Sequence, residues 1–431
     1  MNSSLKYIDL FAGAGGLSEG FIREGFQAIA HVEMDKDACN TLKTRLAYHY
    51  LAQNNKLSIY KAYLKNEITR EVLWGDIPEH IMESVINEEI TGENISGIFN
   101  NIDKQSDGHK VDLIIGGPPC QAYSIVGRSR DPNRMEGDKR NFLFRYYAEF
   151  LIKYKPKLFV FENVLGLLNA GNKSYLNEMI QLFESIGYSV AEPTVLNAED
   201  YGVLQKRRRV IIMGQMGNRK FDFPELQKVE NKWQIKKDLF SDLPYLNPGE
   251  ECNIVKYTEP INEYLRTTEI RNGVDIVTQH ITRKHNIRDL EIYSIAIDKW
   301  VNEKKRLKYS DLPARLQTHN NKKAFPDRFK VVDPDGHSHT MVAHISKDGH
   351  YYIYPDLKQI RSISVREAAR IQSFPDDYFF EGGRTAAFKQ IGNAVPPLMA
   401  RAIANTLKKC CNDNNTNTKR HFHSPPEGKN Y

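Results

Sequence analysis

The stretch KYIDLFAGAGGLSEGF at residues 6–21 decides the fold class. Its first part, residues 6–11, is apolar enough for a buried β-strand, and a glycine-rich turn follows. Leu17 and Phe21 then recur at helical spacing. A strand, a glycine-rich turn and a helix in this order form the first unit of an open parallel sheet that binds a ligand at the turn.

The strand pattern recurs along the first half of the chain. Short apolar runs at residues 28–35, 111–117, 157–164 and 207–215 alternate with helix-like segments. Near-continuous apolar strands separated by helices are typical of a parallel sheet that is covered on both faces. The sequence therefore predicts an α/β protein with a doubly wound, mostly parallel sheet.

Composition divides the chain into four parts. Residues 1–215 carry the strand and helix pattern and form the predicted cofactor-binding and catalytic domain. Residues 216–355 are polar and rich in turn residues, which indicates a smaller, strand-rich domain. Residues 356–410 return to a helical pattern and are expected to complete the first domain, whereas the Asn- and Thr-rich residues 411–431 are expected to be disordered. Residues 79–110 look like an insertion between the second and third strands, with no function assigned.

The overall composition excludes several classes of protein. The 431 residues carry a formal net charge of +6, and no apolar run approaches the roughly 18 residues that a membrane span needs. The first residues do not form a secretory signal, and the five cysteines include no C-x-x-C pair. We therefore expect a cytoplasmic protein without membrane contact, disulfides or a metal site. Four histidines, at positions 337, 339, 344 and 350, match no common zinc spacing.

Three signals in order point to an adenosine-containing cofactor. The glycines at 13, 15 and 16 allow a ligand to approach the backbone at a helix N-terminus. Glu33 ends the next strand, where a carboxylate can accept both ribose hydroxyls. Asp76, in WGDIP at 74–78, is interpreted as another strand end that accepts from the adenine amino group. These signals do not separate a nicotinamide dinucleotide from S-adenosylmethionine.

A second group of residues carries reactive chemistry. Cys120 follows Pro118 and Pro119 at the end of an apolar run, so its thiol is expected to face the cofactor cleft. Glu162 comes at the end of another such run and can act as an acid if it is partly desolvated. Arg207 and Arg209 alternate within QKRRR, and they share a face if this segment is extended.

Six blocks of sequence together resemble the C5-cytosine DNA methyltransferases of bacterial restriction–modification systems. The blocks are DLFAGAGG, GGPPCQ, FENV, QKRRR, RSISVREAARIQSFP and IGNAVPP, and they occur in the order typical of that family. The resemblance covers nearly everything outside 216–355 and the tail. It implies the fold of the S-adenosylmethionine-dependent methyltransferases and makes residues 216–355 a target recognition domain.

The resemblance also implies a role for each reactive residue. Cys120 would add to C6 of cytosine, Glu162 would hold and protonate N3, and Arg207 with Arg209 would contact the base carbonyl. The activated C5 would then take the methyl group of S-adenosylmethionine. The residues that would line the cofactor site are Phe11, Gly13, Ala14, Gly15, Gly16, Glu33, Met34, Asp76, Ile77, Pro119, Leu143, Asn393 and Val395.

The implied substrate is a cytosine in double-stranded DNA, which must be flipped out before C6 can be reached. The basic loop at 121–140 is the expected clamp, and a helix opened by the capping box of Ser364 and Glu367 presents further arginines. The residues expected to contact DNA are Ser124, Arg128, Arg130, Arg134, Arg366 and Arg370. About 6–10 neutralised phosphates would lower the affinity about 10³- to 10⁵-fold between about 50 and 200 mM salt.

Three other interpretations account for part of the sequence. A tRNA cytosine methyltransferase would lack a large recognition region, and a silent DNA-binding regulator would not need Cys120, Glu162, Arg207 and Arg209. A nicotinamide oxidoreductase leaves the Pro-Pro-Cys segment unexplained. We therefore expect a monomeric DNA methyltransferase, paired in function with a cognate restriction endonuclease. The sequence does not reveal its target site.

Overall fold

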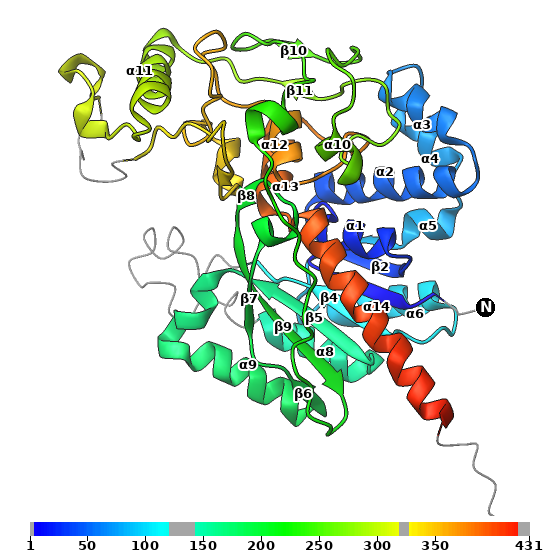
Figure 1. Ribbon diagram of the computed structural model, residues 1–431. Coiled ribbons are helices and arrows are strands. Elements are labelled where there is room, and N and C mark those ends of the chain that lie inside the picture. The colour runs from blue at the N-terminus through cyan, green and yellow to red at the C-terminus, as the bar shows by residue number, and fades with distance from the viewer. Residues whose placement is uncertain (1–3, 120–142, 319–326, 421–431) are drawn as a thin grey trace, which may run out of the picture.

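The computed structural model describes residues 4–119, 143–318 and 327–420. Within these residues an eight-stranded sheet has the order β3-β2-β1-β4-β5-β9-β6, with β7 also paired to β9 (Figure 1). Strands β1 to β5 are parallel, and β9 runs antiparallel to β5, β6 and β7. The predicted mostly parallel sheet is therefore confirmed. The strands are β1 (Lys6–Leu10), β2 (Gln27–Glu33), β3 (Val85–Asn87), β4 (Leu113–Gly116), β5 (Leu158–Asn163), β6 (Tyr188–Val190), β7 (Thr194–Asn197) and β9 (Arg208–Met216).

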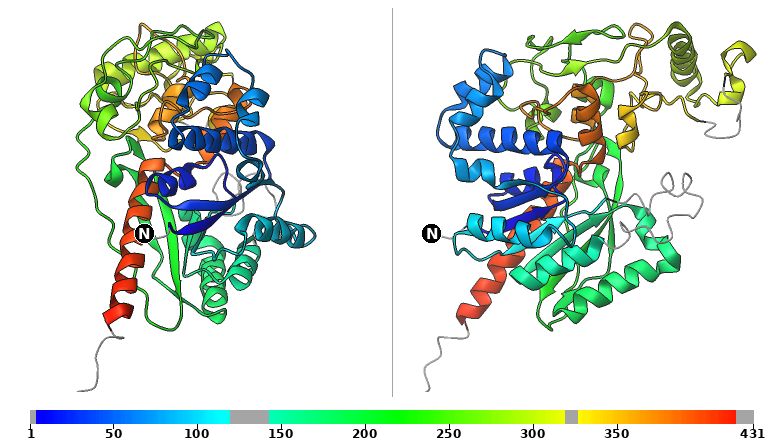
Figure 2. Two further views of the ribbon diagram at one scale, coloured as in Figure 1. Left: turned by 90° about the vertical axis from the view of Figure 1, so that its right-hand side faces the viewer. Right: turned by 180° about the vertical axis from the view of Figure 1, so that it is seen from behind.

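Helices cover both faces of the sheet. Helices α1 (Gly16–Arg23) and α14 (Pro397–Arg420) lie on one face, and α6 (Ile95–Ser106), α8 (Leu143–Tyr154) and α9 (Ser174–Ser185) lie on the other, as the left view of Figure 2 shows. Helices α1 and α14 pack so closely that a Cβ atom on Gly20 would be 2.4 Å from the backbone nitrogen of Arg401. None of the helices in the described ranges is both long and apolar enough to cross a membrane.

The segment from 79 to 110 is a regular part of this fold and not an insertion. It contains the edge strand β3, which pairs with β2, and helix α6, which packs its Ile95, Ile98 and Ile102 into the core. Strand β3 is only three residues long and includes a polar asparagine, so its residues form no clear strand pattern. Four helices before it form a layer with their own apolar cluster: α2 (Lys36–Gln53), α3 (Leu57–Leu64), α4 (Arg70–Gly75) and α5 (Glu79–Glu83).

The region at 216–355 is not strand-rich, which corrects the sequence-based expectation. The strands β10 (Glu251–Cys252), β11 (His280–Ile281) and β12 (Ser338–His339) have two residues each, and the longest element is helix α11 (Ile287–Glu303). The buried side chain of Arg361, just after this region, donates to the backbone oxygen of Leu246 within it. Helix α10 (Glu263–Thr267) is a further short element of this region, and β12 pairs with β8 (Gln205–Lys206).

The segment after residue 356 divides between two cores. Helices α12 (Val365–Ile371) and α13 (Arg384–Asn393) share one apolar cluster with residues of the 216–355 region, whereas α14 covers the sheet. The predicted capping box of Ser364 and Glu367 is confirmed. The prediction of disorder from residue 411 was wrong over its first part, because α14 continues to Arg420.

Candidate active site

The predicted cofactor and reactive residues meet at one edge of the sheet. Strands β1, β2, β4 and β5 are parallel neighbours, so their carboxyl ends lie together. The glycine turn follows β1, Glu33 ends β2, and the segment at 117–119 follows β4. Glu162 is the second-to-last residue of β5. The strand order changes direction at β1, which is where open α/β sheets bind their ligands.

Glu33 is tied directly to the glycine turn. Its carboxylate accepts hydrogen bonds from the backbone nitrogen of Gly13 and from that of Asp35, both at 2.8 Å. Burial raises the pKa of Glu33. Gly13 has a φ of +56°, and a Cβ atom built there would meet no atom within 4 Å. The turn therefore leaves open space beside a carboxylate, which fits a ligand that carries hydroxyl groups.

The C-terminal segment of the chain lies against the glycine turn. A Cβ atom on Gly16 would be 2.3 Å from the backbone oxygen of Val395, so the glycine turn lies against the chain that follows α13. Asn393 is exposed at the end of that helix, and Met34 is 60% exposed just after Glu33. The other predicted members are placed as follows: Phe11, Ala14 and Gly15 in the turn, and Leu143 at the start of α8.

The buried carboxyl group of Asp9 lies close to the glycine turn in the chain. Its side chain is buried on β1, and neither carboxylate oxygen has a hydrogen-bond partner among the residues that the structure describes. Burial and the nearby Glu33 hold the pKa of Asp9 well above its usual value. An unpartnered buried acid next to the glycine turn suits a ligand that brings positive charge, as S-adenosylmethionine does with its sulfonium and amino groups.

The prediction that Asp76 ends a strand was wrong. Asp76 is the exposed C-cap of helix α4, and Ile77 is buried in the separate apolar cluster of that helical layer. The strand beside β2 is β3, whose Asn87 donates to the backbone oxygens of Glu33 and Met34 at 3.1 and 3.0 Å. Glu88 and Glu89 follow it and are exposed. The sequence signal for this strand end was an apolar pair, Val85 and Ile86, followed by two acids.

Glu162 and Arg209 form the reactive pair that the structure describes. The Nε atom of Arg209 lies 2.7 Å from Oε1 of Glu162, and their side chains are 11% and 14% exposed. Strands β5 and β9 pair with Glu162 opposite Ile211, so Arg209, two residues before Ile211, lies diagonally across from Glu162. This arrangement presents a paired carboxylate and cation to the edge of the sheet while leaving part of each accessible.

The segment that leads into Cys120 is anchored at the same place. Asn163, next to Glu162, donates from Nδ2 to the backbone oxygen of Pro118 at 3.4 Å. Pro119 is exposed. Cys120 itself lies outside the described residues, and so do Ser124, Arg128, Arg130 and Arg134.

Arg207 does not share the position of Arg209. Its guanidinium group is 0% exposed and donates to the backbone oxygens of Met341 and Gly392. The chain passes from β8 to β9 at Arg207, so the two arginines are not alternate residues of one strand. In this structure Arg207 joins the 216–355 region to the end of α13, whereas Arg209 forms an ion pair with Glu162.

The expectation that Arg366 and Arg370 contact DNA was wrong, because both are buried. Arg370 bonds to Asp242 and to Asp376, with its shortest contacts to them at 2.5 and 2.6 Å. Arg366 donates to the backbone oxygen of Thr278 at 3.0 Å and to that of Tyr378 at 3.0 Å. Both guanidinium groups are therefore used inside the protein, where they join the 216–355 region to the segment after α12.

Comparison with known proteins agrees with this geometry. Residues 5–78 and 79–409 match the family model of the C-5 cytosine-specific DNA methylases. The chain belongs to this family. The methyltransferase is 43% identical to the type II methyltransferase M.Bpa9945I of Bacillus paralicheniformis, over 94% of this chain and 99% of the relative. It is 31% identical to the type II methyltransferase M.DdeI of Desulfomicrobium norvegicum, over 96% of this chain and 93% of the relative.

Solved structures support the fold of the methyltransferase. A prophage-encoded E. coli protein, described as a DNA modification methyltransferase, superposes with a TM-score of 0.59 at 22% identity, covering 95% of this chain and all of the other. Together with the family match, the relatives show that the chain is a DNA (cytosine-5-)-methyltransferase of the restriction–modification type.

Proposed function

We propose that this methyltransferase modifies a cytosine that has been flipped out of double-stranded DNA, through a covalent bond between Cys120 and C6 of the ring. The contact of Glu162 with Arg209 at 2.7 Å carries the proposal. It lies beside the anchored segment at 117–119, whose next residue is Cys120. A nucleophile, an acid and a cation at one strand edge are what addition to a pyrimidine ring requires.

The residues of this chain have separate tasks in that reaction. The Cys120 thiolate forms a bond to C6, and the displaced ring electrons are accommodated as N3 takes a proton from Glu162. Arg209 holds the Glu162 carboxyl in position and faces the ring carbonyl. C5 becomes electron-rich and takes the methyl group of S-adenosylmethionine, which would leave as S-adenosylhomocysteine. Loss of the C5 proton to solvent then re-forms the double bond between C5 and C6 and expels the Cys120 thiolate, and N3 returns its proton to Glu162.

The cofactor proposed is S-adenosylmethionine, which supplies an electrophilic methyl group when it is bound. Glu33 would accept from its ribose, the backbone at Gly13 would lie against it, and Asp9 would offset its positive charge. Asn393 and Val395 would close the pocket from the C-terminal segment. The open space at Gly13 supports this placement, because no atom of the described residues lies within 4 Å of a Cβ atom built there.

The 216–355 region is proposed to read the DNA sequence. Figure 1 shows its elements at one end of the sheet, on the far side of α12 and α13. Arg207 fixes it to Gly392 in the last turn of α13, next to Asn393. The type II names of the relatives support a protective role, in which methylation blocks a restriction endonuclease of the same specificity.

Trapping on 5-fluorocytosine tests the covalent step. Fluorine at C5 prevents the release of the thiol, so the wild-type enzyme with S-adenosylmethionine should form a denaturant-resistant complex with duplex DNA. The Cys120→Ala variant should bind the same DNA without forming this complex. Bisulfite sequencing of DNA from expressing cells gives the target, and an endonuclease that cuts this target should then fail to cut the DNA. A wild-type enzyme that methylates DNA without ever being trapped would contradict the mechanism.

A further inference from the structure

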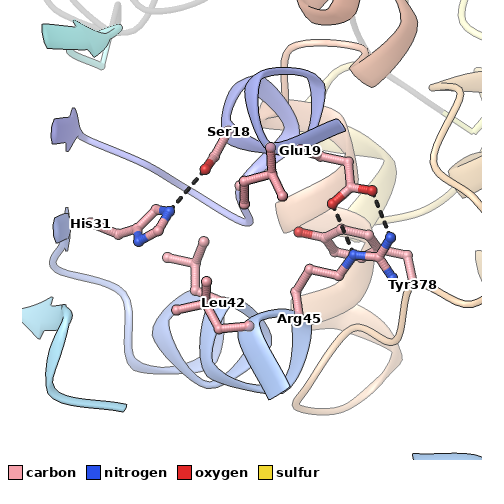
Figure 3. Close-up of a pocket in the computed structure, with 9 residues that line it drawn as sticks. Ser18, Glu19, His31, Leu42, Arg45 and Tyr378 are labelled. Atoms are coloured by element: carbon pink, nitrogen blue, oxygen red, sulfur yellow. Dashed lines mark hydrogen bonds and ion pairs between the residues drawn. The ribbon is translucent and has the colours of Figure 1, made fainter. Parts of the chain in front are cut away.

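A small cavity lies next to the glycine turn. Gly15, Leu42, Arg45 and Tyr378 are among the residues that line it. Figure 3 shows Tyr378, Arg45 and Glu19 on one side and His31 with Ser18 on the other. Buried polar side chains, those of Ser18, Glu19, His31 and Arg45, line it together with leucines and an isoleucine, and none of the proposed catalytic residues lies among them.

Tyr378 reaches from the C-terminal segment to the turn itself. Its hydroxyl donates a hydrogen bond to the backbone oxygen of Ala14, between the two glycines with φ of +56° and +78°. A Cβ atom on Gly15 would be 3.0 Å from the same hydroxyl oxygen. The phenol therefore supports the turn from behind, at the point where its backbone is least like ordinary strand or helix.

Several contacts hold Tyr378 in place. The Arg45 guanidinium lies 4.8 Å from the centre of its ring and forms ion pairs with Asp377 at 2.9 Å and Glu19 at 2.6 Å. Arg366 donates to its backbone oxygen at 3.0 Å. Because its ring and backbone are fixed on both sides, the hydroxyl is presented to Ala14 in one position.

We propose that Tyr378 is a positioning residue for the cofactor, which it serves by fixing the backbone of the glycine turn at Ala14. It touches no reacting atom, and the inference rests on the proposed cofactor site at Gly13 and Glu33. Loss of the hydroxyl frees the Ala14 carbonyl to rotate, so the turn spends less time in the shape that the ligand needs. The cost should appear in cofactor affinity and not in the chemical step, because Glu162 and Arg209 are unaffected.

The test compares two single-oxygen deletions, Tyr378→Phe and Tyr60→Phe. Tyr60 is the matched control, because its buried hydroxyl donates to the backbone oxygen of Asp377 at 2.6 Å, in the same network but not to the turn. Calorimetry measures the Kd for S-adenosylhomocysteine, and methylation of duplex DNA measures kcat and the KM for S-adenosylmethionine. Tyr378→Phe should raise this Kd and this KM by about five- to tenfold, the effect of one hydrogen bond, and should change kcat little. Tyr60→Phe should leave Kd unchanged.

Two outcomes would overturn the inference: an unchanged Kd in Tyr378→Phe, or an equal rise in both variants, which would indicate general loosening. If Tyr378→Phe is too unstable to purify, the comparison uses two variants that carry 4-aminophenylalanine, one at position 378 and the control at position 60. This weaker donor should raise Kd only at position 378. Failure of the wild-type enzyme to bind S-adenosylhomocysteine would instead contradict the proposed cofactor, so the two failures are distinguishable.

Discussion

Gly117 lies so close to Glu162 that a Cβ atom on the glycine would be 2.6 Å from the carboxylate oxygen Oε2 and 2.7 Å from the backbone oxygen. The second glycine of GGPPC therefore leaves room for the acid that the proposed mechanism needs. The adjoining prolines restrict the backbone that continues toward Cys120. The motif serves Glu162 as well as the thiol.

The Gly117→Ala substitution should lower kcat because the new methyl group displaces the Glu162 carboxylate. A misplacement of about 1 Å can cost about 10²-fold in rate. Single-turnover methylation measures the loss, and calorimetry with S-adenosylhomocysteine should show little change in affinity. Gly97→Ala is the control, because a Cβ atom there would meet nothing within 4 Å. Equal activities of the two variants would contradict the assigned role of Gly117.

Glu33→Gln should weaken cofactor binding by about 1.5–3 kcal/mol, the contribution of hydrogen bonds to a charged group. Burial raises the pKa of Glu33, so the wild-type affinity should fall on acidification at a higher pH than an ordinary glutamate would give. Calorimetry from neutral to acidic pH checks both points. Glu33→Gln should show a smaller pH dependence, and an unchanged pH profile in this variant would assign the titration to another group.

The end of β3, and not Asp76, should affect adenine binding. The double substitution Glu88→Gln with Glu89→Gln should raise the Kd for S-adenosylhomocysteine by about fivefold, the effect of about 1 kcal/mol for one hydrogen bond. Asp76→Asn should leave it unchanged, since Asp76 caps an outlying helix. In titration calorimetry, a raised Kd for Asp76→Asn together with an unchanged Kd for the double variant would contradict this and place Asp76 in the cofactor site.

Arg370→Met should destabilise the protein by about 3–5 kcal/mol, because Asp242 and Asp376 would remain buried without their cation. Urea unfolding measures the loss. Lys104→Ala, which removes an exposed pair with Glu83, should cost no more than about 1 kcal/mol. A well-folded Arg370→Met protein with a reduced salt dependence of DNA binding would instead favour a phosphate contact.

Acid should destabilise the fold through three buried histidines. Burial lowers the pKa of His31, His280 and His285 from 6.5 to about 4, so each is neutral in the folded state. Their contribution is complete above pH 6.5 and is lost as the pH falls toward 4, since the unfolded chain then binds more protons. A shift of this size at His31 corresponds to about 3 kcal/mol. Unfolding free energies that stay level between neutral pH and pH 5 would contradict this.

The residues at strand ends were predictable because the strands themselves carry strong patterns. Long apolar runs before Gly116 and Glu162 locate the sheet, and a parallel sheet must bring their carboxyl ends together. β3 was missed because three residues are too few for a pattern, and this displaced the third cofactor residue to Asp76. The pairing of Glu162 with Arg209 depends on the antiparallel strand β9. The residues of β9 alone do not indicate which strand it pairs with.

The arginines show what a sequence pattern cannot supply. Arg366 and Arg370 sit four apart on a short helix, a spacing typical of an exposed cationic face. The partner that makes Arg370 internal is Asp242, which is 128 positions away in the chain. Arg207 likewise bonds to Met341, which is 134 positions away. Only the tertiary fold distinguishes these residues from arginines that meet phosphate.

The close contact of Gly20 with Arg401 has a consequence for biosynthesis. Helix α1 buries Leu17 and Phe21 in one cluster with Met399 and Ile403, which are translated some 380 residues later. The nascent chain therefore carries an uncovered apolar surface on α1 until α14 has been translated. Chaperone capture of ribosome-bound chains that stop just before Pro397 should reveal this delay, and a slower ribosome would prolong it.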